Sequence, residues 1–246
     1  MDDHTVTGRA MAILEAVGAG LGPMTLSKLV AETGIPKPSV RRIANRLVDH
    51  RILHRESGGY SLGLHLAELG QLAARQLGTA ETASPFIHEL HQRTRQIAWI
   101  GTAGDDGFVM LESSFALRHS QLMAAEWPPP APPGLFGATA AGQLLLSTRP
   151  QLVDLFLQSG PTRLTPYTVT NPQLIVRRLE RVAETGLAIE REETRVGWWC
   201  GAVVIPGPTT PHILGLTAEL HGMSPHRGLR QLQQIADELT CELKST

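Results

Sequence analysis

The sequence predicts an α+β protein in two parts, an N-terminal winged helix-turn-helix and a C-terminal α/β domain, joined by a helix. Residues 25–62 contain two short amphipathic helical patterns on either side of a Gly-Ile-Pro corner, and a hairpin pattern follows them. Beyond residue 80, strand patterns mix with helical patterns, which is typical of a sheet covered by helices. A chain of 246 residues is long enough for two domains.

The N-terminal part, residues 1–63, is called the head and carries clear start and stop signals for helices. Thr25 is a suitable N-cap, Gly34 suits a left-handed helix end, and Pro38 is tolerated at a first helical position. Gly58 and Gly59 would supply the positive φ angles of a hairpin turn. We therefore expect helices at 6–18, 25–33 and 38–49 and strands at 52–56 and 60–62.

Basic side chains gather on the second of the two corner helices and on the hairpin. Residues 28–55 include seven basic and two acidic residues, although the net charge of the whole chain is −1. In a DNA groove, Arg pairs with guanine and Asn with adenine, while Ser and helix N-terminal amides hold phosphates. The alternative is a small helical domain with a solvated charged face. The candidate DNA-binding residues are Thr25, Ser27, Lys37, Pro38, Ser39, Arg41, Arg42, Asn45, Arg46 and Arg55.

The rest of the chain begins with an apolar connector helix at 63–78, whose broad apolar face suits packing on a partner. The proline-rich stretch at 127–134 predicts a loop, either a rigid surface spacer or a lid over a pocket. The other expected helices are at 84–96, 137–146, 150–158, 171–186 and 225–243, and the expected strands are at 96–102, 108–112, 187–193, 200–206 and 212–220.

Four segments of the chain resemble, in the right order, those of the IclR family of bacterial transcription regulators. They are IPKPSVRRIANRLVDHRIL, GATAAGQLLL, RLTPYTVTNPQLIVRRLERVAETGLAIEREE and WWCGAVVIP. They are similar to the family's recognition helix, small-residue helix start, L-T-P-x-T-I-T-x-P segment and C-x-A-x-P-I strand. The resemblance covers about residues 5–243. It implies a winged head at 1–63, a linker helix at 64–79, and an effector-binding and oligomerisation domain of sensor (GAF-like) type at 80–246.

The resemblance also implies a function. Family members act as homodimers or homotetramers that bind a double-stranded, pseudo-palindromic DNA operator. A small molecule bound by the C-terminal domain changes the affinity for the operator. The identity of this effector, the operator sequence and the choice between repression and activation do not follow from the sequence.

The family's effector site can be transferred to this chain by motif. Its helix-start amides correspond to Ala140 and Ala141, and free N–H groups at a helix N-terminus attract an anionic oxygen. Its two strand serines correspond to Thr217 and Glu219, whose spacing of two places both side chains on one face of a strand. The implied effector-binding residues are Ala140, Ala141, Glu190, Trp198, Cys200, Thr217 and Glu219.

Several positions depart from the family pattern. Gln143 replaces a helix lysine, Glu219 replaces a serine, and Pro38 stands where a serine usually begins the recognition helix. If Glu190 and Glu219 both face the site, their charges disfavour a dicarboxylate. A polyol, an amine or a flat neutral molecule stacked on Trp198 would fit better. As alternatives, the cysteine and the tryptophan are ordinary core residues and Glu219 forms a salt bridge elsewhere.

Other classes of protein find less support in the sequence. We expect no enzyme, because there is no G-x-S-x-G elbow, phosphate loop, H-E-x-x-H or C-x-x-C pattern. We expect no metal and no cofactor besides the effector. With two cysteines, no membrane-length apolar run and no secretory signal, the expected location is the cytoplasm. The alternatives are a winged-helix interaction protein without DNA binding and, with less support, a small-molecule enzyme.

Overall fold

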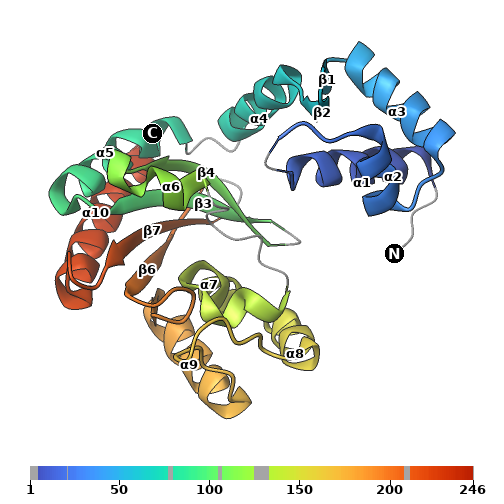
Figure 1. Cartoon of the computed structure of the whole chain (residues 1–246). Helices are drawn as coiled ribbons and strands as arrows, with labels where there is room; N and C mark the ends of the chain where they lie inside the picture. Colours follow the sequence, from blue (N-terminus) through green and yellow to red (C-terminus); the bar gives the residue numbers. More distant parts are fainter. Residues whose placement is uncertain are drawn as a thin grey trace. The chain divides into compact units, whose positions relative to one another are not determined.

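The computed structural model describes residues 5–20, 22–76, 80–104, 107–124, 133–207 and 211–245. The chain falls into two compact units, Met1–Gln76 and Leu77–Thr246 (Figure 1). The first unit contains α1 (Val6–Gly18), α2 (Leu26–Thr33), α3 (Lys37–Asp49), β1 (Leu53–Glu56), β2 (Gly59–Leu62) and α4 (Leu64–Gln76).

The first unit is a winged helix-turn-helix, as the sequence predicts. Thr25 caps α2, since its hydroxyl accepts a hydrogen bond from the Lys28 amide, and Gly34 ends α2 at φ 65°. The antiparallel hairpin β1–β2 gains a third short pairing where Met24 and Tyr60 exchange both backbone hydrogen bonds. The core comprises Ile13, Val17, Met24, Leu29, Ile35, Val40, Ile43, Ala44, Leu53 and Tyr60.

The second unit is built on a five-stranded antiparallel sheet in the order β4-β3-β7-β6-β5. Its strands are β3 (Ile97–Gly104), β4 (Gly107–Ser114), β5 (Leu187–Arg191), β6 (Trp198–Ile205) and β7 (His212–Glu219). Its helices are α5 (Ala80–Thr94), η1 (Leu117–His119), α6 (Ser120–Ala124), η2 (Pro133–Ala138), α7 (Ala140–Thr148), α8 (Pro150–Ser159), α9 (Pro172–Thr185) and α10 (Pro225–Ser245).

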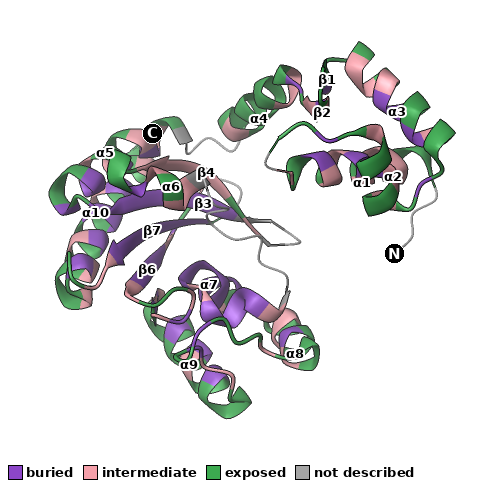
Figure 2. Ribbon diagram, viewed as in Figure 1, coloured by how far each residue is buried: buried purple, intermediate pink, exposed green. Residues whose placement is uncertain are grey.

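Helices cover both faces of this sheet. On one face, α5 and α10 enclose a core that includes Trp199 and Leu216. On the other, α7 packs on the strands around Cys200, and Leu122 and Met123 of α6 join the same cluster. Helix α7 is buried almost along its whole length (Figure 2). The second face, which carries Cys200, is called the sensing face.

Several boundaries differ from the expected ones. Helix α5 starts at Ala80, and Ser84, expected near its start, instead donates a hydrogen bond to Glu112 of β4. Pro85 therefore lies inside the helix, where it costs a backbone hydrogen bond. Helix α7 starts at Ala140 because Thr139 caps it. Other differences include the start of α3 at Lys37, the start of β6 at Trp198 and the end of β5 at Arg191.

Only one of the two glycines expected at the hairpin turn has a positive φ angle. Among the described glycines of the hairpin, Gly59 has a positive φ of 141° and Gly58 does not. A Cβ on Gly59 would lie 2.3 Å from the Met24 carbonyl oxygen, so the third pairing requires glycine there. The expected loop at 127–134 falls largely on residues 125–132, which lie outside the described residues. The two alternatives, a rigid spacer and a lid, are therefore both still predictions. The short helices η1 and α6 were not predicted.

Candidate nucleic-acid interface and effector site

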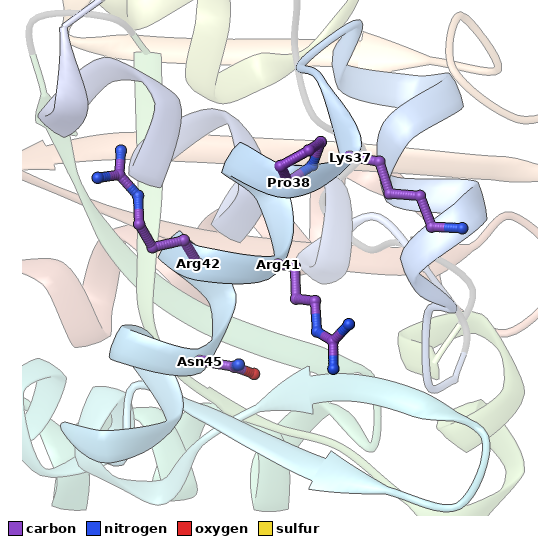
Figure 3. A pocket seen from close by; sticks show the side chains of 5 residues that line it. All are labelled: Lys37, Pro38, Arg41, Arg42 and Asn45. Atoms are coloured by element: carbon purple, nitrogen blue, oxygen red, sulfur yellow. The ribbon is translucent and has the colours of Figure 1, made fainter.

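The exposed side of α3 forms a basic concavity. Lys37, Pro38, Arg41, Arg42 and Asn45 line a hollow of about 510 Å³ (Figure 3). Three of these five residues carry a positive charge, and within the described residues none of the three is in an ion pair. Such a surface has its hydrogen-bond donors free for a phosphate or a base edge.

The hairpin orients this surface through Tyr60. The Tyr60 hydroxyl donates a hydrogen bond to Asn45 Oδ1 over 3.4 Å, and the Arg55 guanidinium lies 5.9 Å from the Tyr60 ring centroid. The tyrosine is 4% exposed and packs in the core of the head. The interpretation of the sequence missed this positioning role, although a Tyr next to the turn in a basic hairpin was a usable signal.

The other candidate DNA-binding residues differ in their exposure and in their hydrogen bonds. Ser27, Arg46 and Arg55 are exposed, whereas Ser39 is half-buried in the first turn of α3. Thr25 is exposed, but its hydroxyl already accepts the hydrogen bond that caps α2. Thr25 can therefore still donate a hydrogen bond to a phosphate, because a hydroxyl carries one donor and two acceptor sites.

On the sensing face, three of the candidate effector residues form one row across three strands. The strand register pairs Glu190 with Cys200 and Cys200 with Thr217. The Thr217 hydroxyl donates to Cys200 Sγ over 3.2 Å and accepts from Trp99 Nε1 over 3.1 Å. All three members of the row are buried. The strand pairing brings together groups that are up to 27 positions apart in sequence.

Burial controls the chemistry of this row. It raises the pKa of Glu190 to about 7, against opposing hydrogen bonds from the Glu193 amide and the Thr194 hydroxyl. Burial, followed by the charge of Glu190, raises the pKa of the Cys200 thiol far above its usual range. The thiol is therefore inert at neutral pH, which agrees with a packing role.

The helix-start residues lie on the same face. Ala140 and Ala141 are buried in the first turn of α7 and pack against the cluster around Cys200. The Thr139 hydroxyl accepts from the Gly142 amide, whereas the amides of the first helical positions have no partner within a helix. This end of α7 can therefore offer N–H groups to an acceptor on the sensing face.

The remaining two candidates lie at the end of the sheet. Trp198 and Glu219 pair across β6 and β7, and both are half-buried. Trp199 points to the opposite face, where its Nε1 donates to the Met223 carbonyl, so only one of the two adjacent tryptophans lies on the sensing face. Both carboxylate oxygens of Glu190 accept hydrogen bonds, one from the Glu193 amide and one from the Thr194 hydroxyl, so this side chain is held in place.

Two residues outside the predicted set lie on or beside the helices that cover the sensing face. His119 packs edge-on against Trp198, and Gln143 lies fully buried on α7. The histidine had no sequence signal, because neither η1 nor α6 was predicted.

No group of three or more His, Cys, Asp or Glu residues in the described part of the chain could hold a metal ion. Among the described residues, no helix is long and apolar enough to cross a membrane.

A winged head with a basic recognition helix, together with a separate helix-covered sheet, defines a DNA-binding regulator with a sensor domain. The chain matches the IclR helix-turn-helix domain over residues 6–57 and the bacterial transcriptional regulator IclR C-terminal domain over residues 71–210. The second match alone spans more than half of the 246 residues. The chain therefore belongs to the IclR family and is a transcription regulator, not an enzyme.

Several proteins illustrate this relationship. The HTH-type transcriptional regulator KipR of Bacillus subtilis is 28% identical over 171 residues, which cover 69% of this chain and 68% of KipR. TtgV of Pseudomonas putida is 24% identical over 222 residues, covering 82% and 81%. An IclR homolog from Microbacterium hydrocarbonoxydans, solved with 4-hydroxybenzoate, shares the fold with a TM-score of 0.81, 20% identity, and coverage of 98% and 100%.

Proposed function

We propose that this regulator binds a double-stranded operator through α3 and the β1–β2 hairpin, in the cytoplasm where bacterial DNA lies. The observation that carries the proposal is the basic concavity, whose cations lie outside any described ion pair. Arg41, Arg42 and Asn45 would contact base edges in the major groove, since these residue types match guanine and adenine. Lys37 and Arg46 would hold phosphates.

The other candidate residues have supporting roles in this proposal. Thr25, Ser27 and Ser39 lie at the N-terminal ends of α2 and α3, where hydroxyls and free amides suit a phosphate. Pro38 shapes the entrance of the groove without offering a donor, because proline has no N–H group. Arg55 on the hairpin would contact the backbone or the minor groove.

We further propose that a small molecule binds on the sensing face and changes the operator affinity. The relevant groups are the amides of Ala140 and Ala141, the row Glu190–Cys200–Thr217, and the pair Trp198 and Glu219. The homolog solved with 4-hydroxybenzoate supports effector binding by a domain of this fold. The carboxyl groups of Glu190 and Glu219 favour an effector without a second negative charge.

Helix α4 is proposed as part of a homodimer interface. None of its residues is buried, and Leu64, Leu69 and Leu72 are 81%, 44% and 51% exposed. A helix with a wide uncovered apolar face is expected to pack on a partner. A second copy is the favoured partner, because a two-fold pair of heads matches a pseudo-palindromic operator. A tetramer would be two such pairs.

Replacing the arginines of the concavity tests the DNA-binding proposal. After selection of a binding sequence with purified protein, Arg41→Ala and Arg42→Ala should each weaken binding to it. A lost base contact costs about 1–3 kcal/mol, or roughly 5- to 150-fold in affinity. Fluorescence anisotropy at several salt concentrations measures both the affinity and its salt dependence.

The matched control is Arg177→Ala, which removes an exposed arginine from α9 in the second unit. This variant should bind the selected DNA as the unchanged protein does. Normal DNA binding by both head variants would show that α3 is not the recognition helix. Absence of salt-dependent DNA binding in the unchanged protein would favour a winged-helix interaction protein instead.

A further inference from the structure

His119 occupies an unusual position beside the proposed effector site. It lies in η1, just before α6, and is 2% exposed. Its ring meets the ring of Trp198 edge-on, with centroids 5.7 Å apart and planes at 71°. Because Trp198 pairs with Glu219 in the sheet, the histidine lies at the same sheet end as both candidate effector residues.

The hydrogen-bond partner of this histidine fixes where its proton lies. Arg118 Nε donates to His119 Nε2 over 3.2 Å, and a guanidinium can only donate. The Nε2 atom must therefore hold the lone pair. Burial, followed by the charge of Arg118, lowers the pKa of His119, so the ring is neutral. Its one proton is then on Nδ1, which is buried and has no partner among the described residues.

Within the described residues, Gln143 has a buried acceptor without a partner, whereas His119 has a buried donor without one. Its Nε2 donates to the Gly137 carbonyl over 3.1 Å, which leaves Oε1 as a buried acceptor without a described partner. Helix α7, which carries Gln143, and helix α6, which follows His119, both pack on the sensing face. Buried polar groups in folded proteins are almost always paired. His119 Nδ1 and Gln143 Oε1 have no partner among the described residues, so each is free to pair with a bound molecule.

We propose that His119 determines the specificity of the effector site by donating a hydrogen bond from Nδ1 to an uncharged oxygen of a flat effector lying beside Trp198. This proposal rests on the proposed function and deepens it. A neutral imidazole offers a hydrogen-bond donor without a positive charge. It therefore does little to offset the repulsion between a ligand carboxylate and the carboxyl groups of Glu190 and Glu219. The half-buried Trp198 ring suits an aromatic ring. Gln143 Oε1 would accept from a donor on the effector.

Benzamide and benzoate form a matched pair of probes for this chemistry. They have nearly the same shape, but benzamide offers a neutral carbonyl oxygen and N–H donors, whereas benzoate is an anion. In a ligand-observed NMR titration of the full-length protein, we expect benzamide to bind and benzoate to bind at least tenfold more weakly. His119→Leu should weaken benzamide about tenfold, the effect of one lost hydrogen bond. His119→Asn, which keeps an N–H near the Nδ1 position, should retain most of the affinity.

A second measurement separates binding from folding. If His119 serves the effector, His119→Leu removes an unpaired buried donor and should not lower the melting temperature of the ligand-free protein. The control His226→Leu replaces an exposed histidine on α10, which covers the other face, and should leave benzamide binding unchanged. Three results would overturn the proposal: no benzamide binding, equal or tighter binding of benzoate, or unchanged benzamide binding by His119→Leu. Operator binding is measured in parallel, so DNA regulation can stand even if this proposal fails.

Discussion

Glu190 holds a carboxyl group that water barely reaches, at 2% exposure. Burial raises its pKa to about 7 from an ordinary value of 4.5. The folded protein therefore binds this proton more tightly than the unfolded chain does. The contribution of Glu190 to stability is fully present below about pH 4.5 and is lost as the pH rises through about 7.

Glu190→Gln should remove this pH-dependent loss. The glutamine carbonyl can still accept from the Glu193 amide, and its NH₂ group can donate to the Thr194 hydroxyl. We expect the variant to be more stable than the unchanged protein at pH 8, by up to about 3 kcal/mol, and similar in stability at pH 5. Urea unfolding at both pH values measures this. An equal loss of stability at both would mean that the carboxylate is the favoured form in the fold.

At the scale of elements, Glu193 ties three parts of the second unit together. Its carboxylate accepts from Arg178 Nη1 of α9 over 2.7 Å and from the Val169 amide over 3.0 Å. Its carbonyl accepts from the Thr168 hydroxyl over 2.7 Å. The residue is 4% exposed, and its own amide donates to Glu190. This network joins α9, the 164–170 segment and the turn after β5, so it holds one end of the proposed effector site.

Arg178→Met should release this network. It leaves the Glu193 carboxylate buried without its cation, and breaking a buried pair from one side costs about 3–5 kcal/mol. The loss should be greater at pH 8 than at pH 5, because Glu193, whose pKa burial already raises, can take up a proton at the lower pH. Arg177→Met, on the exposed side of the same helix, is the control and should change stability by less than about 0.5 kcal/mol. Equal effects of the two variants in urea unfolding would contradict this account.

At the scale of the whole molecule, each of the two units has a hydrophobic core of its own. Helix α4 belongs to the same compact unit as the head. Arg51 of the head lies 3.4 Å from Glu68 of this helix, and the His65 amide donates to the Arg51 carbonyl. The start of α4 is therefore fixed to the head, and its uncovered leucines are presented in a defined position relative to α3.

Leu69→Glu combined with Leu72→Glu should disrupt the proposed homodimer. Two carboxylates on an apolar contact must be desolvated if the helices pair, which is strongly unfavourable. In sedimentation experiments the unchanged protein should have the mass of a dimer or tetramer and the variant a smaller mass, with weaker operator binding. Gln71→Glu adds a charge at an exposed position of the same helix and is the control. An unchanged mass for the double variant would move the interface elsewhere.

The positions of the elements followed from local signals. Thr25, Gly34 and the apolar periodicity of α1 to α3 are each effective within a few residues, so the head was predicted almost to the residue. The misplaced start of α5 shows the limit of this approach. Ser84 and Pro85 look like a helix start in isolation, but Ser84 is bonded to β4, which comes 28 positions later.

The sequence supplied the candidate residues of both proposed sites, but not their hydrogen bonds or burial. It predicted that Cys200 and Thr217 lie together through the family resemblance, and the strand register places them opposite each other. It did not indicate that the Thr217 hydroxyl is already bonded to Trp99, 118 positions away. Tyr60 and His119 were missed because their roles depend on what the folded chain packs around them.

By itself, the sequence determined the element order, the two-part α+β organisation and the family, because these depend on periodicity, capping residues and short motifs along the chain. Only the tertiary structure decided which groups are buried without partners. Burial and strand register arise when α6, α7 and the sheet pack together, and no local sequence pattern encodes that packing. The chemistry of the proposed effector site is therefore a property of the packed sheet, whereas the basic surface of α3 follows largely from the sequence.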